Sequence, residues 1–298
     1  MKMKLLSSIR DIPEFNNENV HVRNEQELLE KLNTIIKDGH GNLQIVTDFD
    51  HTLTKHSLEN GSPVLTSFGM FRECPSIPQE YKDEDNRLAD IYKPIERDPH
   101  MSLEEKTKHM VDWYNAAHAQ LKGVTFPRQE LMAIGHKMID SFRDGVHELV
   151  SWSQRQQVPV LVFSAGLGDS VQAALTAAGF LLPHVKVVSN FLAIGDNDKI
   201  VGIKGDDVIH TLNKNETAIK NTEYYEMVKE RRNVLLMGDS IGDARMAEGM
   251  EHCAAVVKLG FLGHNVRDSL PKYQSQFDVV LVNEPSVRLP NAILQLLA

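Results

Sequence analysis

The sequence predicts an α/β fold in which a doubly wound parallel sheet carries a mostly helical insertion. Two observations predict the sheet: short apolar runs recur along the chain, and helix-like segments alternate with them. A third observation predicts the insertion. Asp50 follows one apolar run, Ser164 follows another, and more than 100 residues separate the two. A hairpin closes such a gap with a few residues, so this length indicates an inserted unit.

The first predicted elements are a helix and a buried strand. Residues 25–37 place Leu28 and Leu32 at helical spacing, and Asp38-Gly39-His40-Gly41 predicts the end of that helix. The apolar run 43–46 follows as the first strand of the predicted site. This strand delivers its polar residues directly into a turn.

The insertion is predicted to be a helical cap. Residues 56–79 are rich in glycine and proline and are expected to form a loop. Predicted helices follow at 83–92, 103–121 and 127–139, with Pro94 and Pro99 separating the first two. The domain division is therefore residues 1–55 and 141–298 for the core and 56–140 for the cap. The alternative is that these helices belong to one larger core.

The alternation of strands and helices resumes after the insertion. Expected strands are 159–163, 185–188, 234–237, 253–259 and 277–282, and a small β-hairpin excursion is expected over 192–208. Expected helices are 146–156, 169–178, 222–231, 243–250 and 291–297. This alternation predicts a parallel sheet with helices on both faces.

The bulk properties limit the classes of function. The chain has 298 residues and a net charge of −9, which argues against broad binding to nucleic-acid polymers or anionic membranes. Cys74 and Cys253 are its two cysteines, so a disulfide framework is not expected. The first ten residues lack the apolar core of a signal peptide, and no stretch is long and apolar enough to span a membrane. We therefore expect a cytoplasmic protein, and a monomer because no long apolar stripe or heptad run is visible.

Two aspartates after the first strand are the strongest chemical signal. Asp48 and Asp50 are spaced i, i+2, and the turn after the strand can bring both to one small site. Carboxylates suit Mg²⁺, which prefers hard oxygen ligands. One carboxylate can attack phosphorus while its neighbour transfers a proton. The alternative for this pair by itself is two solvated turn aspartates that cap a helix.

Further polar clusters support the site. Ser164-Ala165-Gly166 follows the second strand, Lys214 lies in an asparagine-flanked segment, and Gly238-Asp239-Ser240-Ile241-Gly242-Asp243 follows a third strand. Because the carboxyl ends of parallel strands meet at one edge of a sheet, these clusters are expected to build one site.

Taken in order, DFDHTLT (48–54), SAG (164–166), Lys214 and GDSIGD (238–243) resemble the motifs of the haloacid dehalogenase superfamily of phosphotransferases. The fold this implies is a Rossmann-like core with a cap inserted between the first and second motifs. The acid at position 50 is typical of the superfamily's phosphatases and phosphomutases. The segments 110–121, 187–191, 210–225 and 238–249 also resemble the eukaryotic cytosolic 5'-nucleotidase III family of pyrimidine 5'-nucleotidases and their 7-methylguanylate-preferring relatives.

This resemblance implies the roles of the core residues. Asp48 is the expected nucleophile and a Mg²⁺ ligand. Asp50 is the expected general acid and then base, with its backbone carbonyl on the metal. Asp239 is the third expected ligand, and Asp243 orients metal-bound water or Lys214, although a charge at a helix start is an alternative for Asp243.

Phosphate and nucleobase are expected to contact different parts of the chain. Lys214 would neutralise the phosphate, which Ser164 and the amides of Ala165 and Gly166 would cradle. In the cap, Glu96 matches a glutamate that faces the nucleobase in the family. Trp113 and His118 are expected near the base, although aromatic residues there are as well explained as cap core. Ala117 departs from a serine of the relatives, which leaves the choice of base open.

The resemblance thus implies a Mg²⁺-dependent 5'-nucleotidase that hydrolyses nucleoside 5'-monophosphates, such as CMP, UMP or 7-methyl-GMP, through a phospho-aspartate. A phosphotransferase side activity would use the same intermediate. One alternative is a phosphatase for another small phosphometabolite, such as phosphoserine. A second alternative, from a different class, is a non-catalytic nucleotide-binding scaffold.

Overall fold

The fold is built on a seven-stranded sheet with the strand order β1-β9-β8-β7-β2-β3-β4. The structure, a computed structural model, describes residues 5–98, 100–205, 208–215, 219–220, 222–250 and 252–297. The strands are β1 (Val20–Val22), β2 (Leu43–Thr47), β3 (Val160–Leu167), β4 (Val185–Asn190), β7 (Asn233–Gly238), β8 (Ala255–Leu262) and β9 (Val279–Val282). All neighbours pair in parallel except β1, which pairs antiparallel with β9 at one edge.

Side chains of the central strands alternate between two hydrophobic cores. Val160 and Val162 of β3 face one core, and Leu161 and Phe163 face the other. The same alternation in β2 and β7 buries both faces of the sheet, as expected for a parallel sheet covered by helices. The predicted doubly wound α/β core is therefore confirmed.

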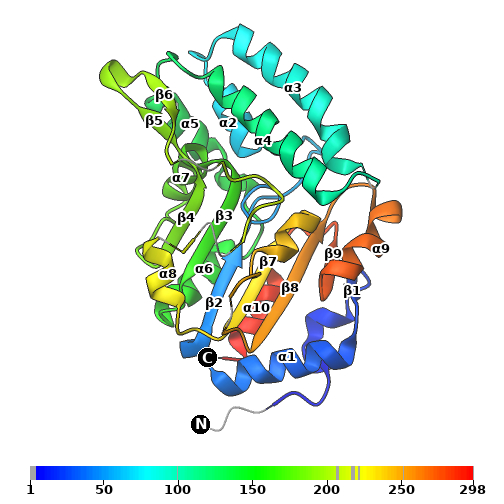
Figure 1. Cartoon of the computed structure of the whole chain (residues 1–298). Helices are drawn as coiled ribbons and strands as arrows, with labels where there is room; N and C mark the ends of the chain where they lie inside the picture. The colour runs from blue at the N-terminus through cyan, green and yellow to red at the C-terminus, as the bar shows by residue number, and fades with distance from the viewer. Residues whose placement is uncertain are drawn as a thin grey trace.

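Helices cover both faces of the sheet (Figure 1). The first core takes up apolar residues of α1 (Glu25–Asp38), α6 (Val146–Arg155), α7 (Gly168–Ala177) and α10 (Arg288–Gln295). The second core takes up those of α8 (Glu223–Val228) and partly buried residues of α9 (Val266–Gln276). Helices α1, α6 and α10 present their buried residues on one face, as expected for amphipathic helices that cover a sheet, whereas α7 is buried on several sides.

The inserted segment lies toward the carboxyl ends of β2 and β3 (Figure 1). It contains α2 (Ser67–Arg72), α3 (Gln79–Arg97), α4 (Leu103–Ala119) and α5 (Arg128–Lys137). Helix α5 packs closely on α7, because Gly135 lacks a Cβ that would lie 2.7 Å from the carbonyl oxygen of Ala173. Helices α3 and α4 pack against each other. The separation of cap and core at residues 56 and 140 stays a prediction.

Several predicted elements differ from the structure in informative ways. The segment 56–79 is not all loop, because Thr66 caps the short helix α2 by accepting a hydrogen bond from the Gly69 N–H. Helix α3 continues through Pro94, which stands in its last turn and there costs only one backbone hydrogen bond. Pro99 lies outside the described residues. Strand β3 extends to Leu167 through a bulge instead of ending before Ser164.

Other differences concern the second half of the chain. The helix expected over 243–250 is a short 3-10 helix, η7 (Ile241–Arg245). Helix α9 was not predicted, because none of its residues is fully buried and its apolar pattern is weak. The hairpin excursion is confirmed as β5 (Leu192–Ile194) and β6 (Ile200–Ile203). Within the described part of the chain, no helix has both the length and the apolar character to cross a membrane.

A buried hydrogen bond between a helix and the central strand gives a first prediction. The Tyr224 hydroxyl of α8 donates to the Gln44 side-chain oxygen of β2 at 2.8 Å, and both residues are buried. Tyr224→Phe leaves that amide oxygen without its donor, so we expect a loss of about 1–3 kcal/mol in the free energy of unfolding. Urea unfolding would measure it. Tyr225→Phe, a half-buried neighbour, is the matched control, and equal losses in the two variants would contradict this explanation.

Candidate active site

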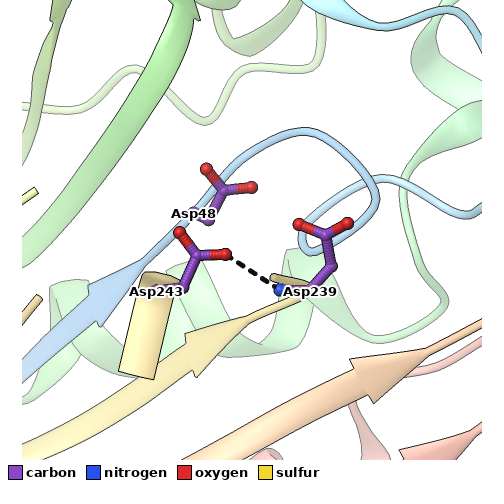
Figure 2. Close-up of side chains that lie close together, drawn as sticks. All are labelled: Asp48, Asp239 and Asp243. Carbon is purple, nitrogen blue, oxygen red and sulfur yellow. Dashed lines mark hydrogen bonds between the residues drawn. The ribbon is translucent and has the colours of Figure 1, made fainter. Parts of the chain in front are cut away.

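Three carboxylates meet where β2 and β7 end (Figure 2). Asp48 follows β2, Asp239 follows β7, and Asp243 lies in η7. The two strands are adjacent, and the Asp48 N–H donates to the Met237 carbonyl at 3.0 Å. One carboxylate oxygen from each of the three aspartates lies within 4.8 Å of the others. The strand order thus brings together residues that are about 190 positions apart in the sequence.

Lys214 joins two of these carboxylates. Its ammonium group donates to Asp48 Oδ1 and, at 2.8 Å, to Asp243 Oδ1. All three side chains are buried. Burial by itself lowers the pKa of Lys214, but the charges of Asp243 and Asp48 outweigh it and raise that pKa above its ordinary value. Lys214 is therefore a permanent cation beside Asp48.

Asp243 is oriented by the turn that contains it. Its Oδ2 accepts from the Ser240 hydroxyl at 2.8 Å, the Ser240 N–H at 2.9 Å and the Asp239 N–H at 3.2 Å. Gly238 makes this turn possible, because a Cβ at that position would lie 2.3 Å from Asp243 Cβ. The carboxylate is thus fully engaged, with one oxygen on Lys214 and the other on the turn.

Mutual repulsion and burial raise the pKa values of the acids in the site. Burial raises the pKa of Asp48 to about 7, with Lys214 opposing and the charges of Asp243 and Asp50 adding to the rise. Burial and the charges of Asp48 and Asp243 raise the pKa of Asp239 well above its ordinary value. One lysine does not neutralise this group of acids, so the site has an excess of negative charge.

The donor set fits a hard divalent cation. Asp48 and Asp239 offer carboxylate oxygens next to each other in a site with excess negative charge. Oxygen ligands of this kind, in small number, are what Mg²⁺ binds in proteins. Both oxygens of Asp243 already accept hydrogen bonds, from Lys214 and from the turn, so Asp243 is expected to support the candidate ligands without binding the cation itself.

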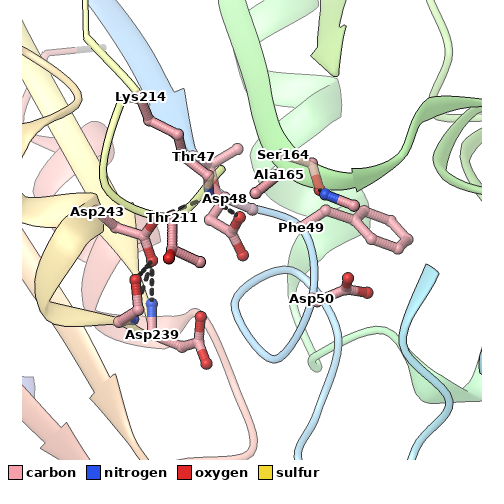
Figure 3. Close-up of polar contacts among 12 residues, drawn as sticks. Thr47, Asp48, Phe49, Asp50, Ser164, Ala165, Thr211, Lys214, Asp239 and Asp243 are labelled. Carbon is pink, nitrogen blue, oxygen red and sulfur yellow. Dashed lines mark hydrogen bonds and ion pairs between the residues drawn. The ribbon is translucent and has the colours of Figure 1, made fainter. Parts of the chain in front are cut away.

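Asp50 lies on the other side of Asp48 from Asp239 (Figure 3). Its carboxylate is held by Ser67 of α2, whose N–H donates to Oδ1 and whose hydroxyl donates to Oδ2, both at 2.7 Å. Burial raises the pKa of Asp50, and the hydrogen bonds from Ser67 oppose that rise. Sequence analysis missed Ser67, because it lies in the segment expected to be a loop.

Ser164 and Ala165 lie on the β3 side of the site (Figure 3), and Gly166 follows them in the same strand. Ser164 is buried, and its hydroxyl oxygen accepts from the Gly166 N–H at 3.1 Å. The Ala165 carbonyl accepts from the Asn190 side chain at 2.9 Å. This segment forms the end of β3, and α7 begins directly after it at Gly168.

Two side chains from distant segments support the loops of the site. The guanidinium of Arg143 donates to the carbonyls of Thr52 at 2.8 Å and His51 at 2.6 Å, and it lies 4.1 Å from the centre of the Phe261 ring. Tyr273 of α9 donates to the Asp239 carbonyl at 2.6 Å. A buried arginine and a tyrosine hydroxyl carry no motif signal, so the sequence did not reveal either role.

The cap residues expected to face the base form an aromatic group on α3 and α4. Trp113 stacks on Tyr92 with ring centres 5.7 Å apart, and Tyr114 contacts Trp113 and His118 edge-on. His118 is buried, and neither ring nitrogen has a hydrogen-bond partner within the described structure. Burial lowers the pKa of His118 to about 4, so it is neutral at pH 7.

Glu96 connects the cap to the segment that carries Lys214. Its Oε1 accepts from the Thr211 hydroxyl at 2.8 Å, and Lys106 donates to its backbone carbonyl at 3.0 Å. Burial raises the pKa of Tyr114 above its ordinary value, and the negative charges of Glu96, Asp50 and Asp48 add to that rise. Tyr114 therefore lies within the electrostatic reach of both Glu96 and the acids of the site.

Comparisons with known proteins find a family model and relatives that match most of the chain. The family model described as Pyrimidine 5'-nucleotidase (UMPH-1) matches residues 51–298. A 7-methylguanosine phosphate-specific 5'-nucleotidase of Drosophila melanogaster is 40% identical over 290 residues, which cover 97% of this chain and 90% of the relative. The enzyme of the same name from Homo sapiens is 30% identical and covers 93% of this chain and 91% of the relative.

Solved structures give the same result. The crystal structure of a cytosolic 5'-nucleotidase IIIB bound to cytidine superposes with a TM-score of 0.93 at 40% identity, covering 97% of each chain. A HAD family hydrolase from Salmonella enterica serovar Typhi has a TM-score of 0.53 at 15% identity and covers 85% of this chain and 72% of that one. The second similarity concerns the fold alone.

The charge of the site predicts how cation binding depends on pH. Asp48 has a pKa of about 7 in the folded protein and about 4 when unfolded, so the metal-free folded state binds more protons between these values. Its stability contribution therefore falls as the pH rises from about 4 to about 7. Mg²⁺ needs ionised ligands, so its stabilisation should grow over the same range and reach about 2.7 kcal/mol at 100 times its Kd.

Thermal unfolding at pH 5 and pH 8, with Mg²⁺ and with EDTA, measures this effect. The Mg²⁺-dependent rise in Tm should be larger at pH 8 and should disappear in Asp239→Asn. An equal rise at both pH values would contradict the assignment of Asp48 as a ligand.

Proposed function

The chain belongs to the pyrimidine 5'-nucleotidase family, and we propose that it hydrolyses nucleoside 5'-monophosphates with Mg²⁺ through a phospho-aspartate at Asp48. Its class is that of the phosphoric monoester hydrolases. The observation that carries the mechanism is the buried Lys214 between Asp48 and Asp243, beside Asp239. We propose a cytoplasmic, monomeric enzyme.

The first step transfers the phosphoryl group to the protein. An oxygen of Asp48 attacks phosphorus, the bond from phosphorus to the ribose O5' breaks, and Asp50 gives its proton to O5'. Lys214 lies beside Asp48 and would neutralise charge on the phosphoryl oxygens, with Ser164 as a further donor. Mg²⁺, held by Asp48, Asp239 and the Asp50 carbonyl, would supply charge neutralisation to the phosphate.

The second step releases phosphate. Asp50, now ionised, accepts a proton from a water molecule that attacks the phosphorus, and the bond between phosphorus and Asp48 breaks. Because Asp50 acts as acid and then as base, its protonation state is restored at the end of the cycle. A nucleoside in place of water would give the phosphotransferase side activity.

The insertion is proposed to select the nucleobase. Glu96 of α3 contacts Thr211, which lies on the segment that carries Lys214. The Glu96 carboxylate can accept hydrogen bonds from an exocyclic amino group, and its negative charge can favour a cationic base. Trp113, Tyr114 and His118 give aromatic surface nearby. The similarity to a cytidine-bound structure and to relatives named for 7-methylguanosine phosphate supports both kinds of substrate.

A substrate panel tests the proposed function. Phosphate release would be measured from CMP, UMP, AMP, GMP, 7-methyl-GMP, phosphoserine and a sugar phosphate, with and without Mg²⁺. We expect turnover of one or more nucleotides that is lost on chelation. Turnover of the non-nucleotides alone would favour the phosphometabolite alternative, and no turnover would favour the scaffold.

Asp48→Asn should abolish turnover of the best nucleotide, because the amide removes both the nucleophile and the charge paired with Lys214. Circular dichroism and a Mg²⁺-independent unfolding curve would check that the variant folds. Undiminished phosphate release by folded Asp48→Asn would remove Asp48 from the mechanism.

Glu96→Gln should change substrate choice more than chemistry. Loss of a charged hydrogen bond to the base costs about 1.5–3 kcal/mol, which is roughly a 10- to 100-fold fall in kcat/KM for the preferred nucleotide. A small aryl phosphate without a base should be affected much less. Glu84→Gln, a partly exposed acid of the same helix that pairs with Arg87, is the control. An equal loss for both substrates in Glu96→Gln would argue against a contact with the base.

A further inference from the structure

The carboxylate of Asp50 is held by one residue of the insertion. Ser67, the first residue of α2, donates its N–H to Oδ1 and its hydroxyl to Oδ2, both at 2.7 Å. Ser67 is fully buried. Both oxygens of Asp50 are therefore fixed by the insertion, whereas Asp48 is bound by Lys214.

The same serine is tied to the end of β3. Its hydroxyl oxygen accepts from the Leu167 N–H at 3.2 Å. Gly166 leaves the space for this contact, because a Cβ there would lie 1.8 Å from Ser67 Oγ and 3.1 Å from Asp50 Oδ2. Ser67 thus connects three segments: the turn after β2, the start of α2 and the end of β3.

This arrangement distinguishes the two oxygens of Asp50. An oxygen that accepts from a backbone N–H at 2.7 Å has little room for a proton on the same side, so Oδ1 is fixed as an acceptor. A serine hydroxyl both donates and accepts. Here it accepts from Leu167 and donates to Oδ2, so a proton carried by Asp50 is placed on the other side of Oδ2, where a leaving group can receive it.

We propose that Ser67 is a positioning residue that fixes the orientation of the Asp50 carboxyl for transfer of its proton to the leaving group. The inference rests on the proposed function, in which Asp50 protonates O5' as the phosphorus–oxygen bond breaks. It makes the insertion part of the phosphoryl chemistry as well as of base selection. A serine that merely filled space would affect all substrates alike.

The test compares CMP with its analogue in which sulfur replaces the bridging O5'. The thiolate leaves as an anion, so its departure needs little help from an acid, whereas the alkoxide of CMP needs a proton. The ratio of kcat/KM for the two substrates reports the first chemical step and cancels changes in nucleoside binding. General acid catalysis contributes about 10²- to 10⁴-fold in enzymes, so partial misplacement leaves a measurable effect.

Ser67→Ala should lower kcat/KM for CMP by about 10- to 100-fold and for the sulfur analogue by less than about 3-fold. Thr66→Ala is the matched control: it removes the cap of α2, which donates nothing to Asp50, and should leave the ratio unchanged. Ser67→Cys, which is similar in size but has a weak S–H donor, should show a smaller selective loss. It replaces Ser67→Ala if that variant does not fold.

The variant Asp50→Asn distinguishes the proposed role of Asp50 as the acid from the proposed role of Ser67. A selective loss for CMP in Asp50→Asn supports the proposed acid, and a matching loss in Ser67→Ala supports the role of Ser67. An equal loss for both substrates in Asp50→Asn overturns the proposed acid and, with it, the role of Ser67. If CMP is not a substrate, the preferred nucleotide of the panel and its sulfur analogue take its place, and no turnover of any nucleotide overturns the proposed function itself. Two outcomes would overturn the role of Ser67 alone. In the first, Asp50→Asn loses activity selectively for CMP, but the Ser67 variants lose it equally for both substrates. In the second, Thr66→Ala shows the same selective loss as the Ser67 variants.

Discussion

The buried contact of Lys214 with Asp48 and Asp243 is the interaction on which the rest of the site depends. Taking these charges out of water is costly, and their attraction compensates only if the geometry is good and the remaining hydrogen bonds are made. Asp243 meets that condition, because its second oxygen accepts three hydrogen bonds from the turn after β7. The site is thus a charged group assembled inside the protein and stabilised by its own contacts.

This charge balance explains why the loops around the site are so firmly supported. A carboxylate with a pKa raised by burial tends to move toward water unless its backbone is fixed. Arg143 binds two carbonyls of the turn after Asp50, and Tyr273 binds the carbonyl of Asp239. Both supports come from segments far away in the sequence, so the core must be folded before the acids are in place.

The insertion meets the core at two chemically different points. At one point Ser67 binds Asp50, and at the other Glu96 binds Thr211, three residues before Lys214. In the proposed mechanism, the first contact involves the residue that transfers the proton, and the second involves the segment that carries Lys214, the expected partner of the phosphate. A movement of the insertion would therefore change the acid, the lysine segment and the aromatic group of α4 together. If the insertion selects the base as proposed, substrate selection and phosphoryl transfer are linked through the same two contacts.

The sequence by itself determined the α/β class, the insertion and the main acids, because these depend on local patterns. Asp48 and Asp239 stand directly after apolar strands, Asp243 lies four residues after Asp239, and parallel strands bring such positions together. The helix through Pro94, the bulged end of β3 and helix α9 were not predictable, since packing against neighbours overrode or replaced the local signal. No sequence motif marks Ser67, Arg143 or Tyr273 as part of the site. Only the tertiary structure decided their contacts with the site, because each contact joins segments that are distant in sequence and adjacent only after folding.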